Sequence, residues 1–197
     1  PFGREPKKYL PYYSNDIDIL YGTGGYIQNA KAQQADYYSD RFDPQQETTA
    51  PYRETILESS PLRRPVEQGG VGEELQPGTG HTTRMEYGYN TADDLVLLWD
   101  FNENSAWCNW DHYPPGALKK KTTVSPDGDT STVFIDARGR KVARRVSASM
   151  GVDADGNRAT GSIELTGYEQ RTATSYTLFD DYDRPVVVIP AIAVERM

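Results

Sequence analysis

The sequence predicts a mainly β protein: an antiparallel sheet built from successive β-hairpins, with one inserted helix near residues 27–42. One observation behind this prediction is a module that recurs imperfectly, in which an aromatic or acidic residue precedes a tight turn, an Arg and an extended run. Its copies are residues 134–146, residues 179–189 and residues 1–10. A second observation is that strand-like runs follow one another at intervals of roughly 8–12 residues, with turn residues between them, as in antiparallel all-β proteins.

The composition fits sheets whose faces are half-buried. Hydrophobic residues make up 37% of the 197 residues, and 14 tyrosines each add a large ring with a polar tip. The formal net charge of −8 argues against binding to nucleic acid or to an anionic membrane, because both need a basic surface. The single Cys excludes an intrachain disulfide, and no apolar run approaches the roughly 18 residues of a membrane span.

In the N-terminal half, prolines and glycines separate the predicted elements. Residues 1–13 are expected to be extended, because two prolines keep them out of a helix interior. Residues 27–42 have good helix propensity. Side chains at helical spacing place one stripe on this helix, made of Tyr26, Ala30, Gln33, Tyr37 and Arg41. A short strand is expected at 55–58, and residues 68–80 are predicted to be an irregular loop because six of them are Gly or Pro.

Strands dominate the C-terminal half. Two are predicted at 82–89 and 94–100, followed by an aromatic loop over 101–116. The later strands are expected at 119–124, 131–135, 141–147, 163–165, 175–179 and 185–189. The large side chains predicted to pack the inner face of the sheet are Phe134, Phe179, Tyr182, Tyr87 and Trp99.

Three residues are predicted to shape the turns of the recurring module: Gly3, Gly139 and Asp183. Asp183 stands where the other copies have Gly, and Asp is among the few residues that tolerate a positive φ. We expect a single β-rich domain over 1–197, with 1–100 and 101–197 as an alternative subdivision. The chain begins within a turn and without an initiator Met, which favours a fragment of a longer protein.

Several segments resemble one protein family. The recurring module resembles the tyrosine-aspartate (YD) repeat of Rhs and teneurin-like proteins, and the chain as a whole resembles the region before the repeat array in Rhs-type proteins of Bacteroidetes. The segments that carry this resemblance span nearly the whole chain and are residues 3–12, 52–55, 60–64, 67–69, 76–81, 85–87, 113–116 and 182–190. Phe134 and Phe179 replace the first Tyr of the repeat pattern.

The resemblance implies a structural segment of a large cell-surface or secreted protein, with no enzymatic activity and no cofactor. In such proteins the repeats curl into a continuous β-sheet shell, which in polymorphic toxins encloses a variable C-terminal effector. The implied partner is the remainder of the parent chain, and an isolated segment would expose sheet edges that favour an edge-mediated dimer. No catalytic residue and no metal ligand are implied.

An alternative function is a carbohydrate- or protein-binding module centred on the aromatic stretch 107–113. Exposed rings could stack on a sugar while the polar side chains bind its hydroxyls; the candidate residues are Trp107, Asn109, Trp110, Asp111 and Tyr113. The competing interpretation is that these rings cover the end of the sheet. A Cys108–His112 pair has no orienting third group, so a hydrolase is the least supported reading.

One further pattern bears on metal binding. Asp153, Asp155, Asn157 and Glu164 match positions 1, 3, 5 and 12 of a calcium loop. However, Arg158 stands at position 6, where that loop needs Gly, so a β-turn is the favoured interpretation. The glycines at 22–25 suggest a phosphate-binding loop, but no Lys-Ser/Thr follows them.

Overall fold

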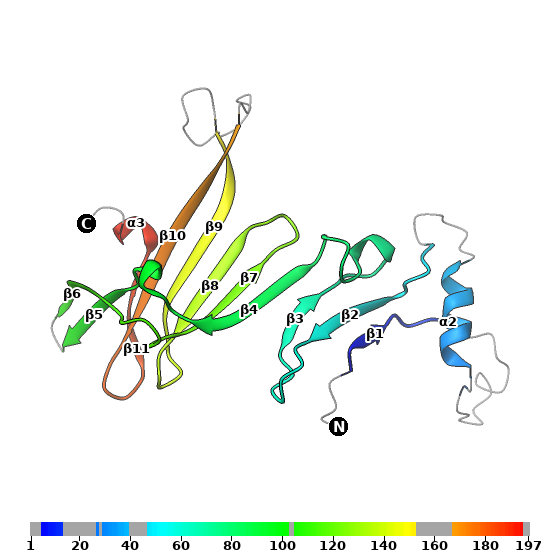
Figure 1. The fold of residues 1–197 in the computed structure, drawn as a ribbon, viewed down its shortest axis with the longest axis horizontal. Coiled ribbons are helices and arrows are strands. Elements are labelled where there is room, and N and C mark those ends of the chain that lie inside the picture. The colour runs from blue at the N-terminus through cyan, green and yellow to red at the C-terminus, as the bar shows by residue number, and fades with distance from the viewer. Residues whose placement is uncertain are drawn as a thin grey trace. The chain divides into compact units, whose positions relative to one another are not determined.

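A computed structural model describes residues 5–13, 27, 29–39, 47–102, 105–152 and 167–194, with the backbone alone at 100–102, 105–110, 150–152 and 167–170. The chain divides into two compact units, residues 1–84 and 85–197. Regular structure in the described residues is mostly antiparallel β, with few helices (Figure 1). The predicted fold class is therefore confirmed.

The first unit holds β1 (Lys7–Tyr9), α2 (Ala30–Ser39), β2 (Tyr52–Leu57), β3 (Pro65–Gln68) and the 3-10 turn η2 (Glu73–Leu75). The strands are hydrogen-bonded in the order β1-β2-β3, and Thr83 and Arg84 of the next strand, β4 (Thr83–Tyr89), pair with β3. All these pairs are antiparallel, as expected for a chain of hairpins.

The inserted helix α2 is held by polar contacts. Gln34 is only 3% exposed, and its side-chain amide donates to the carbonyls of Leu10 and Pro51. The Tyr38 hydroxyl donates to the carbonyl of Pro11 at 2.7 Å. Of the predicted helix stripe, Ala30, Gln33 and Tyr37 are half-buried, while Tyr26 and Arg41 lie outside the described residues. Sequence pattern thus located the helix but missed Gln34, because an amide does not signal burial.

The Gly- and Pro-rich loop at 68–80 is more ordered than the sequence suggests. The Gln76 amide donates to the carbonyls of Tyr52, Gly70 and Gly72 at 3.0–3.1 Å. Gly69 is buried, and a Cβ there would lie 2.6 Å from the carbonyl oxygen of Leu75. The prediction that this loop has no regular structure was wrong at η2, which forms within it.

The second unit contains β4, the 3-10 turn η3 (Ala92–Asp94) and the helix α3 (Ala191–Val194). Its other elements are β5 (Leu97–Asn102), β6 (Ser105–His112), β7 (Lys119–Val124), β8 (Thr130–Ile135), β9 (Lys141–Val152), β10 (Gly167–Phe179) and β11 (Pro185–Ile189). The larger sheet runs β4-β7-β8-β9-β10-β11, and β5 and β6 form a separate hairpin.

The core of the second unit lies on one face of this sheet. Phe134 and Leu118 are fully buried, and Tyr176 and Leu178 of β10 join them. Trp99 from β5 and Val194 from α3 pack against the same cluster. The β5–β6 hairpin and α3 therefore cover the sheet face on which Phe134 lies, as two packed layers require.

Several sequence-based expectations need correction here. The predicted aromatic loop 101–116 is largely strand, because β6 pairs with β5 over residues 105–112. Aromatic residues favour a strand there, because large rings pack well on a half-buried sheet face. The strands predicted at 82–89 and 94–100 lie in different sheets.

Two residues predicted on the inner face lie elsewhere. Tyr182 is 81% exposed because it occupies the tip of a turn, where its ring lies 5.2 Å from the Arg184 guanidinium. Tyr87 lies over the Lys121 ammonium at 5.8 Å, away from the buried cluster. Phe134 and Trp99 pack where the sequence placed them.

Candidate functional site: the paired hairpin turns and the cleft beside them

The turn between β8 and β9 closes on one buried carboxylate. Asp136 accepts hydrogen bonds from the backbone N–H groups of Arg138 and Arg140, both at 2.9 Å, through Oδ1. Its Oδ2 accepts from Nε of Arg140 at 2.6 Å. Two backbone hydrogen bonds close the same turn. The N–H of Asp136 donates to the Arg140 carbonyl, and the N–H of Gly139 donates to the Asp136 carbonyl, each at 3.0 Å. Gly139 adopts a φ of 87°.

The turn between β10 and β11 repeats this arrangement atom for atom. Asp180 Oδ1 accepts from the backbone N–H groups of Tyr182 and Arg184 at 2.9 Å, and Oδ2 accepts from Arg184 Nε at 2.7 Å. Asp180 N donates to the Arg184 carbonyl, and Asp183 N to the Asp180 carbonyl. Asp183 has a φ of 61°, in the position that corresponds to Gly139. The two copies of the module therefore share their bonds as well as their sequence.

The two turns are joined sideways through Asp183. Arg138 and Arg140 both donate to its Oδ1, at 3.3 and 3.1 Å. A non-Gly residue pays a conformational cost at positive φ, of the order of 1–2 kcal/mol. Asp tolerates this conformation better than most residues, and two solvent-exposed ion pairs with the neighbouring turn reduce the remaining cost. We infer that Asp replaces Gly here because the adjacent turn presents two arginines.

A longer hairpin in the first unit uses the same type of closure. Glu58, at the end of β2, accepts from the backbone N–H of Arg64 at 3.2 Å and pairs with its guanidinium at 2.8 and 2.9 Å. Glu58 N donates to the Arg64 carbonyl, and the residue before the arginine, Arg63, has a φ of 46°. An acid–arginine clamp therefore closes three described hairpins. The β7–β8 turn has the same backbone bonds, with Ser125 and Asp129 in the two clamp positions.

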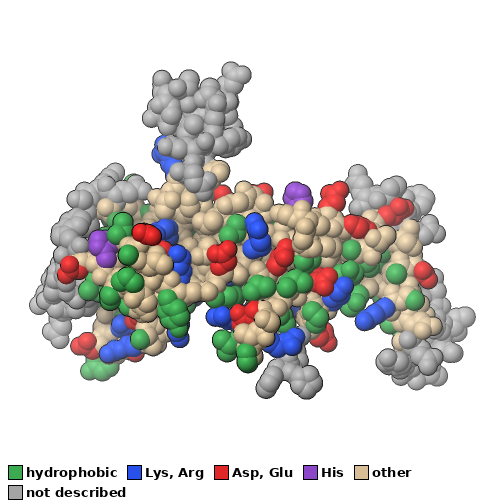
Figure 2. Space-filling view, in the orientation of Figure 1, with side chains coloured by type: hydrophobic (Ala, Val, Ile, Leu, Met, Phe, Trp, Pro, Cys, Tyr) green, Lys and Arg blue, Asp and Glu red, His purple; other side chains and the backbone are tan. Residues whose placement is uncertain are grey.

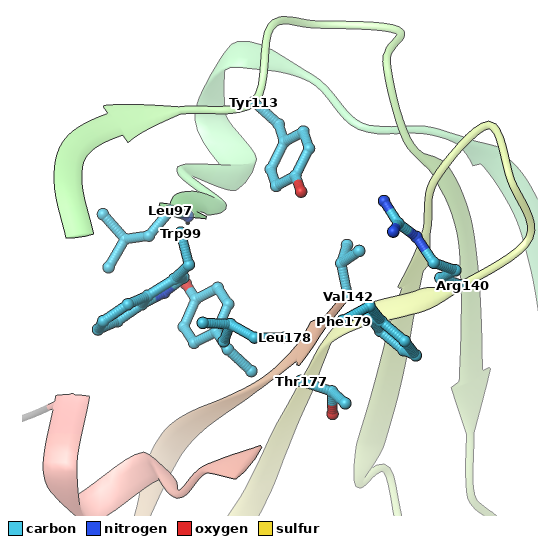
Figure 3. Close-up of a pocket in the computed structure, with 9 residues that line it drawn as sticks. Leu97, Trp99, Tyr113, Arg140, Val142, Thr177, Leu178 and Phe179 are labelled. Carbon is cyan, nitrogen blue, oxygen red and sulfur yellow. Dashed lines mark hydrogen bonds between the residues drawn. The ribbon is translucent and has the colours of Figure 1, made fainter. Parts of the chain in front are cut away.

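A cleft of about 70 Å³ lies beside the Asp136 turn (Figure 3). Its lining combines polar side chains with aromatic rings from the β5–β6 layer and from β10 of the sheet. The lining residues are Leu97, Trp99, Tyr113, Arg140, Val142, Tyr176, Thr177, Leu178 and Phe179. Figure 3 shows the Tyr113 hydroxyl pointing into this space. The lining includes no His, Cys or carboxylate side chain.

Contacts within the cleft hold the β5–β6 layer on the sheet. The backbone N–H of Leu97 donates to the Tyr176 hydroxyl at 3.2 Å, and the Trp99 and Tyr176 rings lie 5.8 Å apart. The Arg140 guanidinium lies 5.3 Å from the Phe179 ring while it binds both turn carboxylates. Among the described side chains, Trp99 Nε1 is one of two buried polar atoms with no hydrogen-bond partner, and the other is Gln76 Oε1.

Two buried polar residues anchor the β5–β6 hairpin at its base. Asn90, 3% exposed, donates to the carbonyls of Tyr113 and Pro114 and accepts from the backbone N–H of Leu118 at 2.8 Å. Asp94 pairs with Lys120 at 2.6 Å, and Arg145 donates to the Asp94 carbonyl. Asn90 and Asp94 thus both have hydrogen-bond or ion-pair partners, which is the condition for burying a polar group at low cost.

Basic and acidic side chains are interspersed on the face of the molecule that Figure 2 shows. Burial raises the pKa of Asp94, but Lys120 and the Thr91 backbone and hydroxyl outweigh burial and leave this pKa below its usual value. The same balance, with Arg140 in place of Lys120, holds the pKa of Asp136 low. The carboxylates at these positions therefore stay ionised at neutral pH and serve as hydrogen-bond acceptors.

The structure places the backbone of the predicted binding residues in and directly after β6, and describes the side chains of only two of them. The side chains of Trp107, Asn109 and Trp110 lie outside the described residues, as does that of Cys108. Asp111 is exposed, and Tyr113 is half-buried in the cleft. His112 and His81 are both exposed.

Other predicted sites also fall outside the described residues. These are the turn residue Gly3, the glycines at 22–25 and the calcium candidates Asp153, Asp155, Asn157 and Glu164. Within the part of the chain that the structure describes, no three His, Cys, Asp or Glu side chains gather as metal ligands would. None of the helices described has the length and apolar character that a bilayer crossing needs.

Sequence reasoning missed the acid–arginine clamp, although the signal was present. Asp136 and Arg140 are four residues apart, and so are Asp180 and Arg184, with the left-handed residue just before each arginine. The recurring module was recognisable by its Gly, the Asp that replaces Gly, and its Arg, but its pattern did not reveal the function of the acid at the start of each turn. Charged pairs at hairpin bases carry structural information when they recur at a fixed spacing.

One family model matches the chain. Residues 1–89 match the family described as "Domain of unknown function (DUF6443)". This match covers the first unit and β4 of the second. No curated protein and no solved structure matches the chain.

Replacing Gly139 with Val should destabilise the second unit by about 1–2 kcal/mol, because a β-branched residue resists a positive φ. A Cβ at this position would meet no atom within 4 Å, so the loss comes from the backbone alone. Thermal unfolding followed by circular dichroism measures it. Gly139→Asn is the matched control and should lose less, since Asn tolerates this conformation. Equal melting temperatures for Val and wild type would refute the turn assignment.

Stability should fall as the pH drops below about 4.5. Arg64 and Ser60 lower the pKa of Glu58 from 4.5 to about 2. The pKa of Asp180 is also lowered, first by the Arg184 backbone N–H. A carboxyl with a lowered pKa in the folded state stabilises the fold above its unfolded pKa and loses that contribution as the pH falls towards the folded value. The clamps should therefore weaken between about pH 4.5 and pH 2.

Urea unfolding midpoints from pH 7 to pH 2, in about half-unit steps, test this dependence. Glu58→Gln should reduce the slope of the part of the curve that belongs to the first unit, where Glu73, whose pKa is also lowered to about 2, still titrates. A wild-type midpoint that stays constant down to pH 2 would show that the clamps do not contribute through their charge.

Proposed function

We propose that this chain is a non-enzymatic structural segment of a large cell-surface or secreted Rhs/YD-repeat protein, in which it contributes to a β-sheet shell. One observation carries the proposal: the β8–β9 and β10–β11 turns have the same bonds and are joined through Asp183. Repeat architectures extend in this way, because each unit bonds mainly to its neighbours in the sequence.

The local geometry explains how such a segment extends a sheet. Each clamp fixes the register of its hairpin, since the acid and the arginine stand at the bases of the two strands. The lateral bond from Arg138 and Arg140 to Asp183 then fixes one hairpin beside the next. These contacts support a structural function, in which the hairpins form a rigid part of the β-sheet shell, more than they support a reaction in the cleft.

The resemblance to Rhs-type proteins of Bacteroidetes supports the finer parts of the proposal. Under it, the partner is the remainder of the parent chain, including any C-terminal effector that the shell encloses, and the location is the cell surface or the exterior. The DUF6443 match over residues 1–89 assigns no function to the first unit and is compatible with this proposal.

Electron cryomicroscopy of the full-length gene product tests this function. The expected result is a closed β shell with this segment in its wall. The variant Arg138→Gln/Asp183→Asn should make the wall easier to cleave in limited proteolysis, whereas Arg53→Gln, at an exposed arginine of the first unit, should not. A full-length protein without a shell, or a segment tethered outside it, would contradict the proposal.

A further inference from the structure

Strand alternation sorts the basic residues of the second unit onto two faces of its sheet. Lys120 and Arg145 reach Asp94 on the face that β5–β6 covers. Successive side chains of a strand point to opposite faces. Lys119, Lys121 and Arg144, their neighbours in sequence, therefore lie on the opposite face, which we call the open face.

The strand register brings four cations together on the open face. In the register of the sheet, Lys121 of β7 lies opposite Val133 of β8. Val133 in turn lies opposite Arg144 of β9, and Arg144 lies opposite Ser175 of β10. Lys119 pairs with Ile135, which pairs with Lys141. Neighbouring strands lie about 4.8 Å apart, so Lys121 and Arg144, which are two strands apart, are separated by about 10 Å, as are Lys119 and Lys141. Along the strands, these two pairs are about 7 Å apart.

These four cations have no carboxylate partner in the described part of the chain. Arg144 donates to the Ser131 hydroxyl at 3.2 Å, and Lys121 lies over the Tyr87 ring. Lys119, Lys141 and Arg144 are exposed. Other arginines of the unit, such as Arg140 and Arg145, do pair with carboxylates. An uncompensated basic group is unexpected in a chain whose net charge is −8.

A shallow hollow of about 420 Å³ lies among these cations. Hydroxyls and two of the cations line most of it: Ser131, Val133, Lys141, Ala143, Arg144, Ser175 and Thr177. Ligand sites of small molecules have volumes of roughly 300–1,000 Å³, so the hollow has room for two or three sugar rings. Hydroxyl side chains can bond sugar hydroxyls, and the cations can bind acidic substituents.

We propose that the open face binds an anionic polysaccharide, through its carboxylate or sulfate groups. Lys and Ser are depleted at protein–protein interfaces, which use aromatic anchors, so the composition of this face favours a glycan over an acidic polypeptide. Nucleic acid is disfavoured, because its continuous phosphate backbone needs a longer basic surface than the four cations of this face provide. This inference rests on the sheet face alone and is independent of the structural function proposed above.

The test measures binding of the 197-residue chain to a heparin-derived octasaccharide and to oligogalacturonate by isothermal titration calorimetry, at low and at physiological ionic strength. Dextran of similar length is the neutral control. The open-face variant is Lys119→Gln/Lys121→Gln/Arg144→Gln. A matched variant, Lys8→Gln/Lys31→Gln/Arg53→Gln, removes the same charge from exposed residues of the first unit.

We expect wild type to bind at least one anionic glycan and not dextran. The open-face variant should lose at least about tenfold in affinity, and the matched variant less than about twofold. If melting shows that the triple variant is destabilised, the single variants Lys119→Gln and Arg144→Gln provide the comparison, with each losing part of the affinity.

Three results would overturn the proposal. One is that wild type binds neither anionic glycan. Another is equal loss of affinity in the two triple variants, which would indicate binding through overall charge. The third is that polyglutamate or a single-stranded oligonucleotide binds as tightly as the glycans, which would assign the face to a different class of polyanion.

Discussion

Replacing Phe134 with Ala should lower the free energy of unfolding of the second unit by about 3–5 kcal/mol, as expected for a large aromatic side chain removed from a packed interior. Phe134 is 0% exposed and belongs to the cluster that joins β8, β9, β10 and the β5–β6 layer. Its ring also lies 5.5 Å from the Arg145 guanidinium, which pairs with Asp94. The cavity should therefore weaken both the apolar core and the anchor of the β5–β6 hairpin.

Urea unfolding followed by tryptophan fluorescence measures this loss, since Trp99 packs against the same cluster. The neighbouring residue Val133 is the matched control, because it lies on the open face and Val133→Ala should cost about 1 kcal/mol or less. Equal costs for the two substitutions would mean that the core does not lie on the face assigned to it.

Asp136→Ala should cost about 3 kcal/mol, the largest effect expected at the turns. The substitution leaves two backbone N–H groups and the Arg140 guanidinium without the acceptor that they share. Bonds to a charged acceptor in a buried position contribute about 1.5–3 kcal/mol, and the three are not additive. Asp136→Asn should cost less, because the amide oxygen can still accept the backbone bonds.

Asp180→Ala provides the comparison for this prediction, because it removes the same three bonds from a turn whose arginine is 72% exposed. We expect a smaller loss there, since solvent can replace an exposed partner. Chemical denaturation of both variants measures the difference. A loss at Asp180 equal to that at Asp136 would mean that burial does not set the strength of the clamp.

Features that depend on neighbouring residues could be predicted from the sequence, whereas features that depend on contacts between distant residues could not. Turn chemistry is local, so Gly139 and Asp183 could be placed at turns before the structure was known, and strand periodicity predicted β7, β8 and β11 closely. The strand at β5 was predicted, but β6 and its pairing with β5 were missed, because the two strands form a second layer rather than continue the sheet. That choice depends on Asn90 and Asp94, whose partners lie 23 to 51 residues away in sequence.

The candidate site shows the same limit. The open face could not be recognised from the sequence, because the cations that pair with Asp94 and those that do not are neighbours along the same strands. Separating them needs the strand register, which fixes Lys121 and Arg144 on one face and Lys120 and Arg145 on the other. Register is a property of paired strands, and one strand taken alone does not specify it.

The joint at Asp183 has a consequence for how such a chain can evolve. An Asp in this left-handed position is further stabilised by a neighbouring turn with arginines at the positions of Arg138 and Arg140. Duplication of a single hairpin would separate the Asp from those arginines, whereas duplication of the pair would preserve them. The heritable building block is therefore the two-hairpin unit, and positions 138, 140 and 183 should covary among descendants of one ancestral sequence.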